Sequence, residues 1–519
     1  MKIYWNKLKN LDNLLFMIVL LLISITRLWG LASTPYGINQ DEAYAGYEAF
    51  SLLKYGFDSW GLKFPVYFIS WGSGMNVLYS YLLIPFFYLL GCNIFVLRLP
   101  QALCGIFACY VFYRILRLFY KKREALIGFF VVGIMPWGIM YSRFGLEANL
   151  LPLFYLLGFY FCLRAFKNNN YILLSALFYA ISMYAYATGW IFVIFTMLIQ
   201  YSYFVYMKHN KIVTIKTFLA LGTFGLLVLP LFLFWLVNNG YINEIKTSFF
   251  SVPKLVYWRA NEIGFNHFGM KFQAFIRCFV YQNDTMRANA LPQFGAFYHL
   301  SLIFGIIGLW VLVKRSYTDL RDKKVSFSFL VLMNIIVGVV YSLMLFSTIN
   351  RLNFLWYFMI MSIIIGVLLF RRKIQLCILL VYLVMFVKFI SFYFTEYNKT
   401  WFTLFRRGIN EALVFINENP KYKYKPVYFV GLDDVHSSVL FLTQYPTDEF
   451  YKNVEWMIYP NAYLDARKFG KYHFIKEFNY DKINNDAIYV FSKWDKYMAA
   501  NFSQYVFREY VVAIPRRIL

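Results

Sequence analysis

The chain has 519 residues, of which 61% are hydrophobic and 15% are charged. Soluble domains carry about a quarter charged residues, so this composition excludes an ordinary soluble protein and indicates membrane spans. The formal net charge is +25, but the basic residues stand in short loops between apolar runs. That pattern is typical of membrane topology and of contact with anionic membrane lipids, and it argues against a nucleic-acid partner.

Apolar runs of membrane-spanning length follow one another through the first 394 residues. Because a helix needs about 20 apolar residues to cross the hydrocarbon core, we predict about eleven transmembrane helices. They are expected at residues 13–32, 95–119, 125–141, 149–166, 171–187, 190–207, 214–237, 298–314, 326–346, 353–370 and 374–394. The first run is long and no small-residue cleavage site follows it, so we interpret it as an uncleaved first span.

Alternate loops between these runs are basic, as at 121–123 and 371–373. Short basic loops stay on the cytoplasmic side of a membrane. We therefore predict a multi-pass plasma-membrane protein with a cytoplasmic N-terminus, whose outer face carries the loops 33–94 and 238–297 and the C-terminal tail. A span at 75–90 would reverse every later basic loop, so we interpret these residues as a surface helix, which follows an amphipathic stretch in the same outer loop.

The chain changes character after residue 394, where charged residues and Asn become more frequent. Three apolar runs there have the length of strands, at 426–430, 487–491 and 510–514. A helical pattern at 405–416 precedes them, and this alternation predicts a small α/β domain. We thus expect a polytopic α-helical domain at 1–394 and an extracytoplasmic α/β domain at 395–519. All six cysteines precede the tail, so no disulfide stabilises it.

Polar residues gather beside the predicted outer membrane boundaries. They are Asp41, Glu42 and Tyr44 in the first outer loop, Arg143 and Glu147 after the third span, His267, Asp284 and Arg287 in the loop 238–297, and Asn350 and Arg351 after the ninth span. Adjacent carboxylates at a membrane face are costly unless they serve ion, proton or substrate chemistry. Carboxylates can accept a proton or hold a divalent cation, and arginines can bind phosphate bidentately. We therefore predict a reaction site at the outer face.

Each of these residues also has a simpler explanation. Arg143 and Glu147 are four residues apart and could form a helical salt bridge. Arg351 could anchor the end of a span, and His267 could be structural rather than a metal ligand. The Asp41–Glu42 pair could belong to an ordinary solvated loop. The shared side of the membrane is the observation that favours a site.

Several of these residues stand in short motifs. The motifs are Asn39-Gln40-Asp41-Glu42-Ala43-Tyr44, Trp71-Gly72-Ser73-Gly74-Met75-Asn76, Arg98-Leu99-Pro100, Ser142-Arg143 with Glu147, Pro292-x-Phe294-Gly295 and Asn350-Arg351. Through them, residues 10–370 resemble the GT-C superfamily of membrane glycosyltransferases, in the branch of the protein O-mannosyltransferases and the lipid A aminoarabinose transferases. The resemblance implies a GT-C fold and transfer of a sugar from a polyprenyl-phosphate donor, usually with inversion, to a glycan, protein or lipid acceptor.

The resemblance also implies roles for single residues. Asp41 matches the principal catalytic carboxylate, and Glu147 stands where the family usually has Asp. Some relatives bind a divalent metal (Mg, Mn or Zn), for which His267 is a candidate ligand. We hypothesise that Asp41 activates the acceptor hydroxyl, that Glu42 and Glu147 orient the acceptor or a cation, and that Arg143 and Arg351 stabilise the leaving phosphate. The other candidates for binding the substrate or its phosphate are Tyr44, Asp284, Arg287 and Asn350.

Three other functions would share some of these features. A transporter or flippase of lipid-linked saccharides would also have many spans, but it predicts charged or broken helices at mid-membrane, which are scarce in this sequence. A polymerase or ligase of lipid-linked saccharides would use the same donor at the same surface. A receptor whose tail binds a ligand would leave the acids and arginines of the membrane part without a catalytic role.

Overall fold

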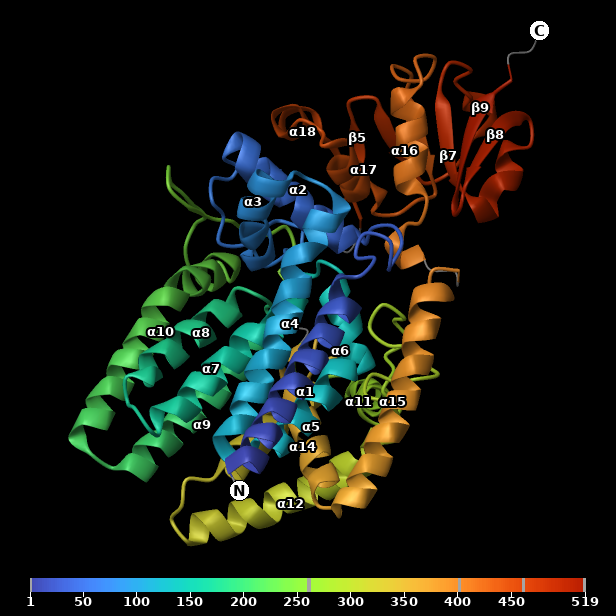
Figure 1. Cartoon of the computed structure of the whole chain (residues 1–519). Coiled ribbons are helices and arrows are strands. Elements are labelled where there is room, and N and C mark those ends of the chain that lie inside the picture. Colours follow the sequence, from blue (N-terminus) through green and yellow to red (C-terminus); the bar gives the residue numbers. More distant parts are fainter. Residues whose placement is uncertain (1, 259–262, 400–402, 460–462, 517–519) are drawn as a thin grey trace. The chain divides into compact units, whose positions relative to one another are not determined.

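The computed structural model describes residues 2–258, 263–399, 403–459 and 463–516 (Figure 1). The chain divides into two compact units, each assembled from separate stretches. The helical unit contains residues 1–29, 101–229 and 260–397, and the loop–tail unit contains residues 30–100, 230–259 and 398–519. The tail thus groups with the first outer loop, and the expected domain boundary at residue 394 stays a prediction.

The apolar helices lie mostly in the helical unit. They are α1 (Lys2–Leu28), α4 (Ile94–Phe119), α5 (Lys122–Ile134), α6 (Pro136–Met140), α7 (Leu151–Ala165), α8 (Tyr171–Met183), α9 (Gly189–Lys208), α10 (Lys211–Asn238), α11 (Phe268–Phe279), α12 (Ser301–Arg321), α13 (Phe327–Leu343), α14 (Asn353–Leu368) and α15 (Arg372–Thr395). Helices α4 and α10 each continue into the loop–tail unit.

Membrane-spanning helices are confirmed, but their predicted number is not. Among the described residues, seven helices are long and apolar enough to cross a membrane, or eight if the pair 122–134 and 136–143, bent by 65°, is one span. Pro136 follows the break between that pair, as expected of a residue that cannot continue the helical hydrogen bonds. Each of the eleven predicted runs falls on a helix, yet α8, α13 and α14 have 13, 17 and 16 residues and do not meet the length of a span.

The first outer loop of the loop–tail unit forms two helices, α2 (Gln40–Tyr55) and α3 (Leu78–Leu90). The sequence explains both ends of α2: Asn39 caps its start, and Gly56 ends it with a φ of 76°, which a glycine adopts at low cost. The predicted amphipathic stretch and the helix at 75–90 are therefore both helical. Residues of the loop 238–297 add a short hairpin of β1 (Ile245–Lys246) and β2 (Ser251–Val252).

The tail is an α/β domain, as predicted. Its strands are β3 (Val427–Val430), β4 (Glu455–Ile458), β5 (Leu464–Phe469), β6 (Tyr472–Ile475), β7 (Ile488–Ser492), β8 (Phe502–Phe507) and β9 (Tyr510–Pro515). They form one sheet in the order β4-β5-β6-β3-β7-β9-β8, in which β3 pairs parallel to β6 and β7 and the other pairs are antiparallel. Its helices are α16 (Ile409–Glu418), α17 (Val435–Thr443) and α18 (Thr447–Asn453).

Helix α2 is held against the tail inside the loop–tail unit (Figure 1). The hydroxyl of Tyr47 donates to the carbonyl of Tyr445 at 3.0 Å, and the hydroxyls of Ser51 and Thr447 lie 2.8 Å apart. A Cβ atom at Gly46 would lie 2.7 Å from the ring of Phe441, so α2 and α17 approach as closely as a glycine permits. The acidic start of α2 is thereby fixed relative to the tail.

Candidate active site

The first turn of α2 carries Asp41 and Glu42 in a capping box. The side chain of Asn39 accepts the Asp41 backbone N–H at 2.9 Å, and Glu42 Oε1 accepts the Asn39 backbone N–H at 2.9 Å. Both carboxylates also lie at the positive end of the helix dipole, which stabilises negative charge. The Asn-x-x-Glu spacing of the sequence is therefore the local reason that the helix begins here.

Glu42 is joined to Arg98 in a buried ion pair. Arg98 Nε donates to Glu42 Oε2 at 3.1 Å and Nη2 donates to Oε1 at 2.5 Å, and both side chains are fully buried. The remaining guanidinium N–H groups donate to three backbone carbonyls, of Leu31 (3.1 Å), Pro35 (2.7 Å) and Gly37 (2.8 Å). All five donors of Arg98 are thus used, and the loop before α2 is tied to Glu42.

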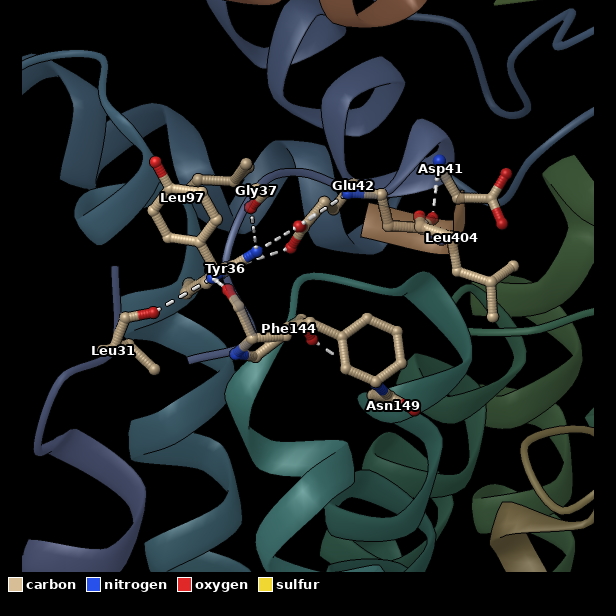
Figure 2. A network of polar contacts seen from close by, with 12 residues as sticks. Leu31, Tyr36, Gly37, Asp41, Glu42, Leu97, Phe144, Asn149 and Leu404 are labelled. Carbon is tan, nitrogen blue, oxygen red and sulfur yellow. Dashed lines mark hydrogen bonds and ion pairs between the residues drawn. The ribbon is translucent and has the colours of Figure 1, made fainter. Parts of the chain in front are cut away.

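Asp41 and Glu42 point in different directions (Figure 2). The Glu42 carboxylate turns toward the ion pair, whereas the half-buried Asp41 carboxylate points away from it. Glu42 therefore positions the loop through Arg98 and Asn39, and its expected contact with an acceptor or a cation stays a prediction. The motif Arg98-Leu99-Pro100 contains this partner, although no role for Arg98 was predicted from the sequence.

Tyr44, expected to bind substrate, is buried. Its hydroxyl donates to the carbonyl of Ile69 at 2.8 Å, and its ring packs against Trp71 with the centroids 5.2 Å apart. Trp71 in turn meets the ring of His436 from the tail at 6.3 Å, and its carbonyl accepts the Leu464 backbone N–H at 3.2 Å. Tyr44 thus connects the acidic helix to the tail through Trp71.

A second pair of acids, one in α2 and one shortly after its end, was not anticipated. Glu48 and Asp58 are both fully buried. Glu48 Oε2 accepts the Ser59 backbone N–H at 2.9 Å, and Asp58 Oδ1 accepts the Leu62 backbone N–H at 2.7 Å. Burial raises the pKa of Glu48 to about 7. Burial, followed by the negative charge of Glu48, also raises the pKa of Asp58.

Arg143 anchors the end of α1 in the helical unit. It is fully buried and donates to the carbonyls of Thr26 (2.9 Å) and Trp29 (2.7 Å), and its guanidinium lies 4.8 Å from the ring centre of Phe394. Arg143 ends one 3₁₀ turn (Tyr141–Arg143) and Glu147 begins another (Glu147–Asn149), with an extended Phe144 between them. The continuous helix that the alternative of an i, i+4 salt bridge requires is therefore not formed.

A buried amide network fixes the loop that carries Glu147. Asn353 Nδ2 donates to Asn149 Oδ1 at 2.9 Å, and Trp137 Nε1 donates to Asn353 Oδ1 at 2.9 Å. Gln101 Nε2 donates to the Asn149 carbonyl at 2.9 Å. Sequence reasoning missed this network because its members lie on four separate stretches, and an isolated Asn or Gln in an apolar run carries no spacing signal.

Asp284 and Asn350 lie together, as the shared outer face suggested. Asp284 Oδ2 accepts Asn289 Nδ2 at 2.7 Å and the Ile349 backbone N–H at 2.8 Å. Asn289 Nδ2 also lies 3.4 Å from Asn350 Oδ1. Burial raises the pKa of Asp284. Next to this junction, Arg351 is half-buried and its Nη1 donates to the Phe346 carbonyl at 3.3 Å.

Arg287 and His267 are exposed. His267 lies immediately before α11, with a φ of 57°, and the carbonyl of Arg287 accepts the hydroxyl of Tyr397 at 3.4 Å. Within the described residues, no three His, Cys, Asp or Glu side chains come together as a metal site. No step through a metal is derived, and His267 as a ligand stays a prediction. The meeting of Asp41 with Glu147 and Arg351 involves both units and likewise stays a prediction.

Comparison with known proteins supports the fold. Residues 76–236 match the family model described as dolichyl-phosphate-mannose-protein mannosyltransferase. A comparison with curated protein sequences gives no match. Among solved structures, ArnT from Cupriavidus metallidurans bound to undecaprenyl phosphate is similar, with a TM-score of 0.57 and 13% identity over 96% of this chain and 97% of that one.

An archaeal enzyme is also similar. The oligosaccharyltransferase AglB from Archaeoglobus fulgidus, in complex with an inhibitory peptide and a dolichol-phosphate, has a TM-score of 0.51 and 12% identity over 84% of this chain. Its complex with Zn and sulfate has a TM-score of 0.51 and 13% identity over 82% of this chain. The chain covers 64% and 61% of these two archaeal chains, less than two thirds of their length. The protein therefore shares the fold of these enzymes, which is the fold that the resemblance in the sequence implied.

Proposed function

We propose that this protein is a membrane glycosyltransferase that moves a sugar from a polyprenyl-phosphate-type lipid to a hydroxyl acceptor at the outer face of the membrane. The fold and the family model support the reaction class. The lipid carrier is inferred from the undecaprenyl phosphate and dolichol-phosphate named for the two similar enzymes. The basic loops support the orientation, with the N-terminus in the cytoplasm and the tail outside.

The direction of the Asp41 carboxylate carries the assignment of the catalytic base. Glu42 is neutralised by Arg98, whereas Asp41 points away from that ion pair. In the proposed reaction, an acceptor hydroxyl attacks the anomeric carbon of the lipid-linked sugar and gives its proton to Asp41. The bond between that carbon and the phosphate oxygen breaks, and the lipid phosphate leaves with the electron pair. The configuration at the anomeric carbon is inverted.

The leaving phosphate gains negative charge as this bond breaks and needs cationic partners. Arg351 fits this role because it is half-buried and follows the junction of Asp284 with Asn350. Arg143 already donates hydrogen bonds to two backbone carbonyls. These bonds favour a role in positioning the end of α1, in addition to its predicted contact with phosphate. Glu147 is proposed to orient the acceptor from the loop that the Asn149–Asn353 network holds.

The test is an assay of the detergent-purified full chain with a panel of polyprenyl-phosphate sugars, with and without a chelator. Release of free polyprenyl phosphate is measured because transfer produces it and transport of an intact lipid does not. Asp41→Asn should lower the rate by about 10²–10⁴, the range for loss of a general base. Asp486→Asn changes an exposed carboxylate of the tail and serves as the matched control.

Equal rates for Asp41→Asn and the wild-type protein would refute the assignment of the base. Failure of the wild-type protein to release polyprenyl phosphate from any donor would count against the function itself. Loss of activity with the chelator, restored by added Mg, Mn or Zn, would support a divalent cofactor. The length of the glycan product separates transfer of a single sugar from the polymerase or ligase alternative.

A further inference from the structure

The tail carries a cluster of polar side chains at the carboxyl end of β3. His436 Nδ1 lies 2.6 Å from Asp465 Oδ1, and Asp465 Oδ2 accepts the Asp434 backbone N–H at 3.3 Å. The hydroxyl of Tyr463 donates to Asp434 Oδ1. Strand β3 is flanked on both sides by parallel strands. In open α/β sheets, the carboxyl ends of the parallel strands are where ligands bind.

This cluster is connected to the start of α2 within the loop–tail unit. Arg406 Nη2 donates to Gln40 Oε1 at 3.1 Å and to the carbonyl of Asp433 at 2.8 Å, so it joins the residue before Asp41 to the residue before Asp434. Burial, the hydrogen bond to Asp434 and the negative charges of nearby carboxylates, Asp41 among them, raise the pKa of Tyr463. The cluster therefore borders the proposed catalytic base.

Buried aromatic side chains pack beside this cluster. Trp71 contacts both Tyr44, one turn after Asp41, and His436 of the cluster. Trp71 is nine-tenths buried, and its indole N–H has no hydrogen-bond partner among the described residues. A buried donor left without an acceptor is costly, so this indole points to an oxygen-bearing ligand.

The chemistry of the cluster favours a ligand rich in hydroxyl groups. Asp434 and Asp465 present hydrogen-bond acceptors, which suit the hydroxyl groups of a ligand and disfavour a phosphate group on it. Arg406 of the tail already donates hydrogen bonds to Gln40 and Asp433. An extended peptide usually binds by adding a strand to a sheet edge. Here the cluster lies at the end of β3 and the start of β5, which are interior strands, while the edges are β4 and β8.

We infer that Asp434 and Tyr463 of the C-terminal domain bind the acceptor next to Asp41, and that this acceptor is a glycan whose hydroxyl groups they recognise. The inference rests on the proposed function, because it makes the tail the acceptor side of that same site. It assigns specificity to the tail and leaves the proton transfer to Asp41.

The test uses the full-length protein in detergent and two variants, Tyr463→Phe and Asp434→Asn, with Tyr497→Phe and Asp486→Asn as exposed controls in the same domain. Binding of free hexose and pentose oligosaccharides is measured by saturation-transfer NMR without donor. In the transfer assay, the acceptor KM is compared with the rate at which the donor is hydrolysed by water. Loss of a neutral hydrogen bond should weaken glycan binding about ten-fold in Tyr463→Phe, and loss of a charge-assisted one should weaken it about 10–100-fold in Asp434→Asn.

Donor hydrolysis should stay within about two-fold of the wild-type rate in both variants, since the acceptor is water there. Equal glycan binding by wild-type protein and variants would overturn the inference, and so would a wild-type protein that binds no oligosaccharide. Binding of a Ser/Thr peptide in place of the glycans would overturn the acceptor class. If the wild-type protein binds glycans through Asp434 and Tyr463 but turns over no donor, the proposed function fails while the binding site stands.

Discussion

Replacement of Arg98 by Met should destabilise the loop–tail unit strongly. The substitution keeps an unbranched side chain but leaves the Glu42 carboxylate buried without its cation, and three carbonyls lose their donor. Breaking a buried ion pair by removing one partner costs about 3–5 kcal/mol. For a unit of roughly 150–250 residues, that corresponds to a fall of about 6–20 °C in the unfolding midpoint.

The measurement is the thermal unfolding midpoint of the detergent-purified protein. Arg321→Met is the matched control, because Arg321 makes an ion pair with Asp322 at the exposed surface, and its midpoint should not change. Glu42→Gln removes the carboxylate instead, and the double variant should lose less than the sum of the two single variants, since both charges are then gone. A midpoint for Arg98→Met within about 2 °C of wild type, or strictly additive losses, would refute the reasoning.

Two further predictions concern the same unit. Burial raises the pKa of Glu48 from 4.5 to about 7, so between these pH values the folded protein keeps a proton that the unfolded chain has released, and stability should fall as the pH rises. Glu48→Gln should flatten this fall, and an unchanged difference between the midpoints at about pH 5 and pH 8 would contradict the shift. Gly37→Ala should lower the unfolding midpoint more than Gly56→Ala. Both glycines have a positive φ (93° and 76°), so the backbone strain is similar. A Cβ at Gly37 would lie 1.9 Å from the Phe405 carbonyl oxygen, whereas a Cβ at Gly56 would meet open space. Equal midpoints would show that the clash is relieved elsewhere.

Hydrophobic periodicity and run length predicted the helices and part of the tail well. The strands β3, β7 and β9 are continuous apolar runs because they are interior strands of the sheet, and α16 has a clear amphipathic pattern. Four strands were missed. Strands β4 and β8 lie at the edges and carry exposed residues such as Glu455 and Val506. Strands β5 and β6 are interior but short, and polar residues interrupt their apolar ones. Edge strands lack the continuous apolar signal on which such reasoning depends.

Candidate residues could be singled out from the sequence where they are neighbours in the chain or lie beside one predicted membrane face, but not where folding alone brings distant segments together. Asp41 and Glu42 drew notice as an adjacent pair, and Asp284 and Asn350 as residues at one membrane face. The Asp434 cluster was missed because its acids and aromatic residues come from separate strands and loops, which only the folded sheet brings together. Glu48 looked like an ordinary polar residue of an amphipathic helix, and its burial beside Ser59 of the first outer loop appears only in the folded chain.

The contrast between Asp41 and Glu42 explains why two adjacent acids are useful here. Successive residues of a helix are rotated by about 100°, so neighbouring carboxylates face different surroundings. One of them can be paired in the interior while the other turns toward a site. Because Arg98 cancels the charge of Glu42 where it is buried, Asp41 is not opposed by an uncompensated negative neighbour. Arg98 therefore contributes to the proposed chemistry without touching the reactants. It fixes the loop before α2 and holds Glu42 in the ion pair, while Asp41 faces away from that ion pair.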